Sequence, residues 1–209
     1  MGIYDKTQTI ESFLSAAAAK QPIPGGGSVA ALAGALAASM GEMVVNYSIG
    51  RKDLVEHQDQ LKQAMTELCR ARHILLELMV EDQAAYEALS GARKRPATDP
   101  DRAGTFEAAL LACIRVPQAV GATAAAVLGL CQRLVESVNK HLLSDLAVCA
   151  ELSMATVRCA ACSIRANLRD VADPDERRSL EQAVVRQIAD CVLLVRDVMA
   201  GIGAREGQP

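Results

Sequence analysis

The run Pro22-Ile23-Pro24-Gly25-Gly26-Gly27-Ser28 precedes an alanine-rich segment that carries no charged residue until Glu42. Two prolines and three glycines disfavour regular structure within the run. Ser28 is expected to cap a helix that starts there, because its hydroxyl can accept from amides of the first turn. Glycines lack a Cβ and allow a ligand to approach the backbone, and a helix N-terminus offers amides to an anion. The run therefore predicts a loop and helix start that contact a negatively charged or strongly polar ligand.

The core of this chain must be built almost entirely from aliphatic side chains. Hydrophobic residues make up 51% of the 209 residues, but these include only three tyrosines, two phenylalanines and no tryptophan. Alanine, leucine and methionine favour helices, and thin side chains let helices pack closely. The chain has no alternating strand pattern of useful length. We therefore predict an all-α fold, a compact bundle of six or seven helices in a single domain spanning residues 1–209.

Periodicity and capping residues place the predicted helices. The ranges are 7–20, 28–49, 55–89, 105–138 with an interruption at Val116-Pro117, 144–169, and a last helix that starts at Asp173-Pro174 and ends near Met199. Residues 90–104 are expected to form a polar surface loop or lid, and the tail beyond Gly201 is expected to fray. Gly34 and Gly41 lie among alanines, and this small-residue face of the Ser28 helix is a candidate dimer contact.

Charge and composition argue against several classes of partner. The net charge of −3 and the scarcity of aromatic residues disfavour a nucleic-acid partner. The N-terminus lacks an apolar signal segment, and residues 29–41 are too short to span a bilayer, so no membrane partner is expected. Seven scattered cysteines indicate a reduced, cytoplasmic protein. Cys159 and Cys162 are interpreted as core cysteines, and no metal site is predicted.

Several motifs occur in an order that resembles the formiminotetrahydrofolate cyclodeaminase and methenyltetrahydrofolate cyclohydrolase family. The strongest is the segment from Pro24 to Leu36, Pro-Gly-Gly-Gly-Ser-Val-Ala-Ala-Leu-Ala-Gly-Ala-Leu. It is followed by Ile49-Gly50-Arg51-Lys52, then by Glu81-Asp82 with Tyr86, then by Val116-Pro117, and finally by Asn139 with Ser144-Asp145 and by Asn167. The resemblance covers essentially the whole chain.

The resemblance implies a dimeric, all-α folate enzyme. The expected activity is hydrolysis of 5,10-methenyltetrahydrofolate to 10-formyltetrahydrofolate, with the tetrahydrofolate derivative as substrate and no separate cofactor. Cyclodeamination of formiminotetrahydrofolate is the alternative within this class. A non-catalytic folate-binding or helical partner protein is the alternative outside it. The residues that the motifs assign to substrate binding are Pro24, Gly25, Gly26, Gly27, Ser28, Arg51, Tyr86, Asn139, Ser144 and Asn167.

Both reactions need a carboxylate near a positively charged carbon and a group that carries a proton. Asp145 is the first candidate, although Ser144 or Asp145 also fits a simple helix cap. Asp82 shares a helix face with Tyr86, where a solvated face is the alternative.

Lys52 and His141 complete the catalytic candidates. Lys52 is a candidate proton donor or ligand for an acidic tail, or else only a partner for a helix C-terminus. His141 is a candidate acid or base because its pKa lies near neutrality. The basic run Arg93-Lys94-Arg95 could contact the glutamate tail of a folate or simply be solvated.

Overall fold

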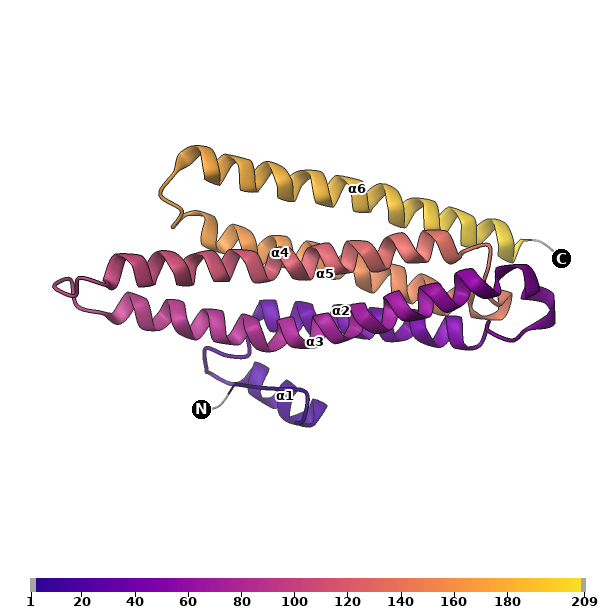
Figure 1. Ribbon diagram of the computed structural model, residues 1–209, viewed down its shortest axis with the longest axis horizontal. Helices are drawn as coiled ribbons and strands as arrows, with labels where there is room; N and C mark the ends of the chain where they lie inside the picture. Colours follow the sequence, from indigo (N-terminus) through magenta and orange to yellow (C-terminus); the bar gives the residue numbers. More distant parts are fainter. Residues whose placement is uncertain (1–2, 208–209) are drawn as a thin grey trace.

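The computed structural model describes residues 3–207, and these fold into six α-helices and two short 3-10 helices, with no strand in that range (Figure 1). The prediction of an all-α fold with six or seven helices is confirmed. The helices are α1 (Ile10–Ala18), α2 (Gly26–Asn46), η1 (Lys52–His57), α3 (Gln58–Lys94), α4 (Arg102–Leu134), η2 (Lys140–Leu142), α5 (Leu143–Leu168) and α6 (Pro174–Glu206).

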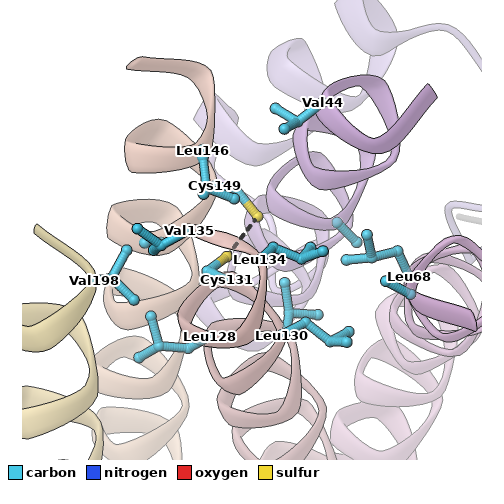
Figure 2. Packing of buried hydrophobic residues seen from close by; sticks show 14 of the residues in the cluster. Val44, Leu68, Leu128, Leu130, Cys131, Leu134, Val135, Leu146, Cys149 and Val198 are labelled. Carbon is cyan, nitrogen blue, oxygen red and sulfur yellow. Dashed lines mark hydrogen bonds between the residues drawn. The ribbon is translucent and has the colours of Figure 1, made fainter. Parts of the chain in front are cut away.

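Helices α2 to α5 form a four-helix bundle in which α2 contacts α3, α3 contacts α4, α4 contacts α5 and α5 contacts α2. Helix α6 lies along α4 and α5, whereas α1 lies on the other side of the bundle, beyond α3 in this view (Figure 1). Because the chain has few aromatic residues, leucine and valine fill the space between the helices. Leu68, Leu128 and Leu134 are at most 1% exposed at the centre of this core (Figure 2).

The small-residue face of α2 packs inside the bundle. A Cβ added at Gly34 would lie 3.1 Å from side-chain atoms of Leu75 and Thr156, and one added at Gly41 would lie 2.9 Å from Leu68. These glycines therefore let α3 and α5 approach α2 closely. The prediction that this face forms a dimer contact was wrong, because neighbouring helices of the same chain already cover it.

The cysteines divide between core and surface. Cys131 on α4 and Cys149 on α5 are buried, with their sulfur atoms 3.3 Å apart (Figure 2). The contact with Cys149 and burial raise the pKa of the Cys131 thiol well above its ordinary value. Cys159 and Cys162 are exposed on α5, so their interpretation as core cysteines was wrong.

Several helices are longer than the sequence pattern predicted. Helix α3 continues to Lys94 and α4 begins at Arg102, so the predicted loop over 90–104 is reduced to residues 95–101. Helix α4 passes through Pro117 without the predicted interruption, and α6 extends to Glu206 instead of fraying beyond Gly201. The packing of buried residues around Pro117 stabilises the helix by more than the backbone hydrogen bond that proline cannot donate.

Three helices, α2, α4 and the segment Lys140–Leu168 that contains α5, are long and apolar enough to cross a membrane by length and composition. The argument that residues 29–41 are too short fails, because α2 has 21 residues. Between 44% and 56% of each apolar window is buried inside the protein. A large part of this apolar surface is therefore used to pack these helices within the bundle.

Candidate functional site

The first turn of α2 lies against a carboxylate from another helix. Helix α2 begins at Gly26 with Gly25 as N-cap, so Ser28 is the third helical residue and the prediction that it is the N-cap was wrong. The Ser28 hydroxyl instead donates to Asp82 Oδ2 on α3, at 2.8 Å. A negative charge is favourable at this position because a helix N-terminus carries partial positive charge.

Gly27 allows this contact because it has no side chain. A Cβ at this position would lie 2.0 Å from Asp82 Oδ1 and 2.5 Å from Asp82 Cγ. Contacts this short cannot exist, so any side chain at residue 27 would displace the carboxylate. The glycine in the motif is thus required by the close approach of α3 to the start of α2.

Asp82 lies in the wall of a cavity of about 360 Å³ between the start of α2, the second half of α3, and the facing parts of α4 and α5. The predicted site residues Gly25, Gly26, Gly27, Asp82, Tyr86 and Asn167 all line this cavity. We call it the Asp82 pocket. The sequence analysis had not assigned other lining residues to the site, namely Pro22, Ile23, Arg93, Cys113, Pro117, Ser163, Ala166 and Arg169.

Some of these missed residues had a sequence signal. Ser163, Ala166 and Asn167 share one face of α5 at spacings of three and four, so the prediction for Asn167 could have been extended to them. Arg93 had been considered as a ligand for a folate tail. Arg169 lies at the end of α5, and only the tertiary structure brings it to the pocket.

Burial sets the protonation of two titratable groups, Asp82 and Cys113, that line the Asp82 pocket. Burial raises the pKa of the half-buried Asp82 carboxyl above its ordinary value, and hydrogen bonding from Ser28 opposes part of that rise. Burial and the nearby Asp82 charge raise the pKa of the Cys113 thiol to about 11, so this thiol is protonated at neutral pH. Arg93 Nη2 donates to Asp170 Oδ2 at 2.5 Å, which connects α3 to the turn before α6.

Asn167 fixes the face of α5 that lines the pocket. Its side-chain Nδ2 donates to the carbonyl oxygens of Ser163 at 3.0 Å and of Cys113 at 3.3 Å. The second bond joins α5 to α4.

Tyr86, at the rim, is 44% exposed. Pro24 is buried and lines a different cavity, beneath α1. No group of three His, Cys, Asp or Glu side chains within residues 3–207 is arranged to hold a metal ion.

The remaining predicted residues form a second cluster, beyond the C-terminus of α2. The backbone N–H of Asn139 donates to Ser48 Oγ at 2.9 Å, and its Oδ1 accepts from the His141 N–H at 3.1 Å. Asp145, half-buried, and Ser144, exposed, follow in the first turn of α5.

Arg51 and Lys52 complete this second cluster. Arg51 forms an ion pair with Asp53, and Lys52 is exposed at the start of η1. We call this group, from Ser48 to Lys52 and from Asn139 to Asp145, the Asp145 cluster.

The length of α2 separates the two groups of predicted residues. A helix rises about 1.5 Å per residue, so the 21 residues of α2 extend over about 30 Å. The Asp82 pocket lies at its first turn and the Asp145 cluster beyond its last turn. Within one chain, Asp82 and Asp145 therefore do not approach the same reacting atom.

The family profile and the named relatives that this chain matches bear the names of cyclodeaminases and of a cyclohydrolase. The profile of the family described as formiminotransferase-cyclodeaminase matches residues 9–186. A methenyltetrahydrofolate cyclohydrolase from Methylorubrum extorquens is 34% identical over 170 residues, covering 79% of this chain and 82% of that protein. A formimidoyltransferase-cyclodeaminase from Gallus gallus is 26% identical and covers 88% of this chain, which spans only 35% of the length of that protein.

A solved structure shares the fold. The crystal structure of formiminotetrahydrofolate cyclodeaminase from Thermotoga maritima superimposes with a TM-score of 0.81 over 95% of both chains, at 22% identity. This likeness supports the arrangement of helices described above. The profile match over most of the chain and the 34% identity to the Methylorubrum protein carry the family assignment. This chain belongs to the formiminotransferase-cyclodeaminase family.

Proposed function

We propose that this protein hydrolyses 5,10-methenyltetrahydrofolate to 10-formyltetrahydrofolate and that Asp82 is its catalytic base. The observation that carries this proposal is the half-buried Asp82 carboxylate, whose pKa is raised by burial in the wall of the pocket. A base whose pKa approaches the working pH transfers protons more effectively. The Methylorubrum relative, named as a cyclohydrolase, supports the choice of substrate.

The proposed chemistry is the hydrolysis of a cationic amidinium. Asp82 removes a proton from a water molecule as its oxygen attacks the methenyl carbon. Asp82 then returns this proton to ring nitrogen N5 as the bond from carbon to N5 breaks. The remaining hydroxyl proton leaves, and the formyl group stays on N10. A negative carboxylate beside the bound cation also stabilises the positive charge in the substrate.

The pocket also offers groups for the rest of the substrate. Gly25 and Gly26 line the pocket with backbone alone, and Tyr86 lies at the rim and is 44% exposed. We propose that Arg93 and Arg169, the cationic lining residues, hold the carboxylate tail of the folate. Lys94 and Arg95, the rest of the basic run, do not line the pocket, and Arg95 pairs with Asp99 at 2.9 Å.

The alternative reaction is cyclodeamination of formiminotetrahydrofolate. It is favoured by the family profile and by the Gallus relative, whose name includes cyclodeaminase. A carboxylate in the same position could return a proton to the departing ammonia. A non-catalytic folate-binding protein is the remaining alternative.

An assay of the purified protein with both substrates separates these functions. We expect the absorbance of the methenyl group to decay faster with enzyme than without it, and no ammonia to form from formiminotetrahydrofolate. Ammonia release without methenyl decay would instead assign the cyclodeaminase. Folate binding in calorimetry, with neither reaction accelerated, would contradict the enzyme proposal and support a binding protein.

We also propose that the protein works as a cytoplasmic homodimer through the outward face of α2. This face consists of Val29, Ala33, Leu36, Met40 and Met43, and the C-cap residue Tyr47 continues it, at alternating spacings of four and three. Val29, Leu36 and Tyr47 are 46%, 50% and 65% exposed. The single charged residue of α2, Glu42, pairs with Arg72 at 2.6 Å. A long apolar face of this spacing is typical of helices that pack against another helix.

A second copy of this chain is the partner that best explains the two separate groups of site residues. If two α2 helices pack antiparallel about a two-fold axis, the start of each helix lies beside the end of the other. The helix dipoles then also oppose each other favourably. The Asp145 cluster of one copy would approach the Asp82 pocket of the other. In this arrangement Asn139, His141 and Asp145 act in the partner's site.

Mixing two inactive variants tests this arrangement. Asp82→Asn and Asp145→Asn dimers are expected to be inactive separately, but a heterodimer would contain one site with both wild-type residues. Random exchange of subunits should therefore restore about one quarter of wild-type activity. The control is a mixture of Asp82→Asn with an Asp82→Asn, Asp145→Asn double variant, which should stay inactive. No recovery after proven exchange, a monomer in solution, or full activity of Asp145→Asn would each contradict the arrangement.

A further inference from the structure

The segment before α2 is attached to the bundle by a buried glutamine next to Asp82. Gln83 is 0% exposed, and its Oε1 accepts from the backbone N–H of Tyr4 at 2.7 Å. Its Nε2 donates to the carbonyl oxygens of Tyr4 at 2.8 Å and of Met79 at 3.0 Å. One side chain thus pairs with both backbone groups of Tyr4, which would otherwise be buried without a partner.

Residues 3–24, which we call the N-terminal strap, contribute Tyr4 and Phe13 to a buried hydrophobic cluster with residues of α2 and α3. Phe13 is the only buried residue of α1, and its ring packs edge-on against Tyr4, with the ring centroids 5.2 Å apart. Ile10 and Leu14 of α1 are 66% and 60% exposed. A cavity of about 600 Å³ lies between α1 and the segment that ends at Pro24. Most of α1 is therefore exposed, and the strap is held to the bundle at Tyr4, at Phe13 and at its end, Ile23-Pro24.

Side-chain hydrogen bonds attach each end of the strap to the nearer end of α1. The Tyr4 hydroxyl donates to the carbonyl of Thr9, the N-cap residue of α1, at 2.8 Å. At the other end of α1, Gln21 Nε2 donates to the Ala16 carbonyl at 2.8 Å. Gln21 is followed directly by Pro22 and Ile23, which line the Asp82 pocket. A displacement of Tyr4 can thus be transmitted through α1 to one wall of the pocket.

We infer that Gln83 is a positioning residue for the substrate pocket, because it holds the strap whose end, Pro22-Ile23, forms a wall of that pocket. This inference rests on the proposed function for the identity of the substrate. Gln83 does not itself line the pocket or contact Asp82 through its side chain. Its loss should therefore weaken substrate binding more than it slows the chemical step.

The first test replaces Gln83 with leucine, which fills similar space but leaves both backbone groups of Tyr4 unpaired. Because the strap then detaches more easily from the pocket wall, KM should rise about tenfold, while kcat changes by less than about threefold. Trypsin cleavage after the exposed Lys20 should become faster as the strap detaches. A wild-type KM together with a wild-type cleavage rate would overturn the inference.

The second test, Gln83→Glu, separates positioning from a general loss of structure. A protonated glutamic acid can accept from the Tyr4 N–H and donate to the Tyr4 carbonyl, whereas the ionised form can only accept. The ratio of variant to wild-type KM should therefore approach one as pH is lowered and rise as pH is raised. The same ratio for Gln83→Leu should not change with pH. Identical pH behaviour of the two variants would overturn the inference.

The readouts distinguish this inference from the proposed function. If the protein does not hydrolyse methenyltetrahydrofolate, the cleavage rate at Lys20 and its pH dependence in Gln83→Glu still report on the strap. If hydrolysis occurs but Gln83→Leu behaves as wild type in both measurements, the inference about Gln83 fails and the proposed function stands.

Discussion

The Asp82→Asn variant is expected to lose methenyltetrahydrofolate hydrolysis, with kcat reduced by about two to four orders of magnitude, the usual contribution of a positioned acid or base. The amide has nearly the same shape and can still accept from the Ser28 hydroxyl, but it cannot remove a proton from water. Binding of the folate, measured by calorimetry, should weaken far less than turnover. A kcat within threefold of wild type would exclude Asp82 as the base.

The pH dependence of Asp82 gives an independent check. Because its folded pKa is raised, the folded protein holds this proton more tightly than the unfolded chain does. The stability that this proton provides is present below the ordinary carboxyl pKa and is lost as pH rises through the raised value. Wild-type kcat/KM should increase over the same window as the base ionises. In Asp82→Asn, thermal unfolding should no longer show this contribution.

The Gly27→Ala variant is expected to lose activity nearly as completely, by about 100-fold or more, because small displacements of catalytic groups have effects of this size. The new Cβ would overlap Asp82 Oδ1, at 2.0 Å, and the carboxylate must move away from the Ser28 hydroxyl. Steady-state kinetics and circular dichroism of the purified variant measure this loss and verify that the protein is folded.

A matched control for Gly27→Ala is Gly91→Ala on α3. Gly91 is an exposed helical glycine, and a Cβ there would meet no atom within 4 Å. This variant should keep wild-type activity and gain about 0.5–1 kcal/mol of stability from reduced backbone freedom. If Gly27 acts through Asp82, adding Gly27→Ala to Asp82→Asn should cause little further loss. Additive losses would show that Gly27 affects the site by another route.

The order and type of the helices could be predicted from the sequence because helix formation depends on patterns that repeat locally. The aliphatic composition, the 3.6-residue periodicity and the Asp173-Pro174 start all led to helices that the structure confirms. The ends were less predictable. Polar residues over 90–104 resembled a loop, yet α3 continues to Lys94, where it buries Ala92, and α4 begins at Arg102.

The residues of the pocket were only partly predictable. The resemblance of the motifs selected Gly25 to Gly27, Asp82, Tyr86 and Asn167, which the structure brings together, but it also selected Asn139 and Asp145, which lie beyond the other end of α2. Motif order along a chain carries no information on distance in space. Asp145 was preferred as the catalytic carboxylate because it lies at the start of a helix. Many aspartates occupy such positions only because they cap the helix.

Composition and periodicity are enough to predict an all-α bundle with an aliphatic core and a glycine-rich start to α2, since both depend only on neighbouring residues. The tertiary structure alone decided the partner of Ser28. A local rule predicted that Ser28 would cap its own helix, but its hydroxyl instead donates to Asp82, 54 residues later. The same contact requires a glycine at residue 27 and partly buries Asp82. Both effects depend on the close approach of α2 and α3.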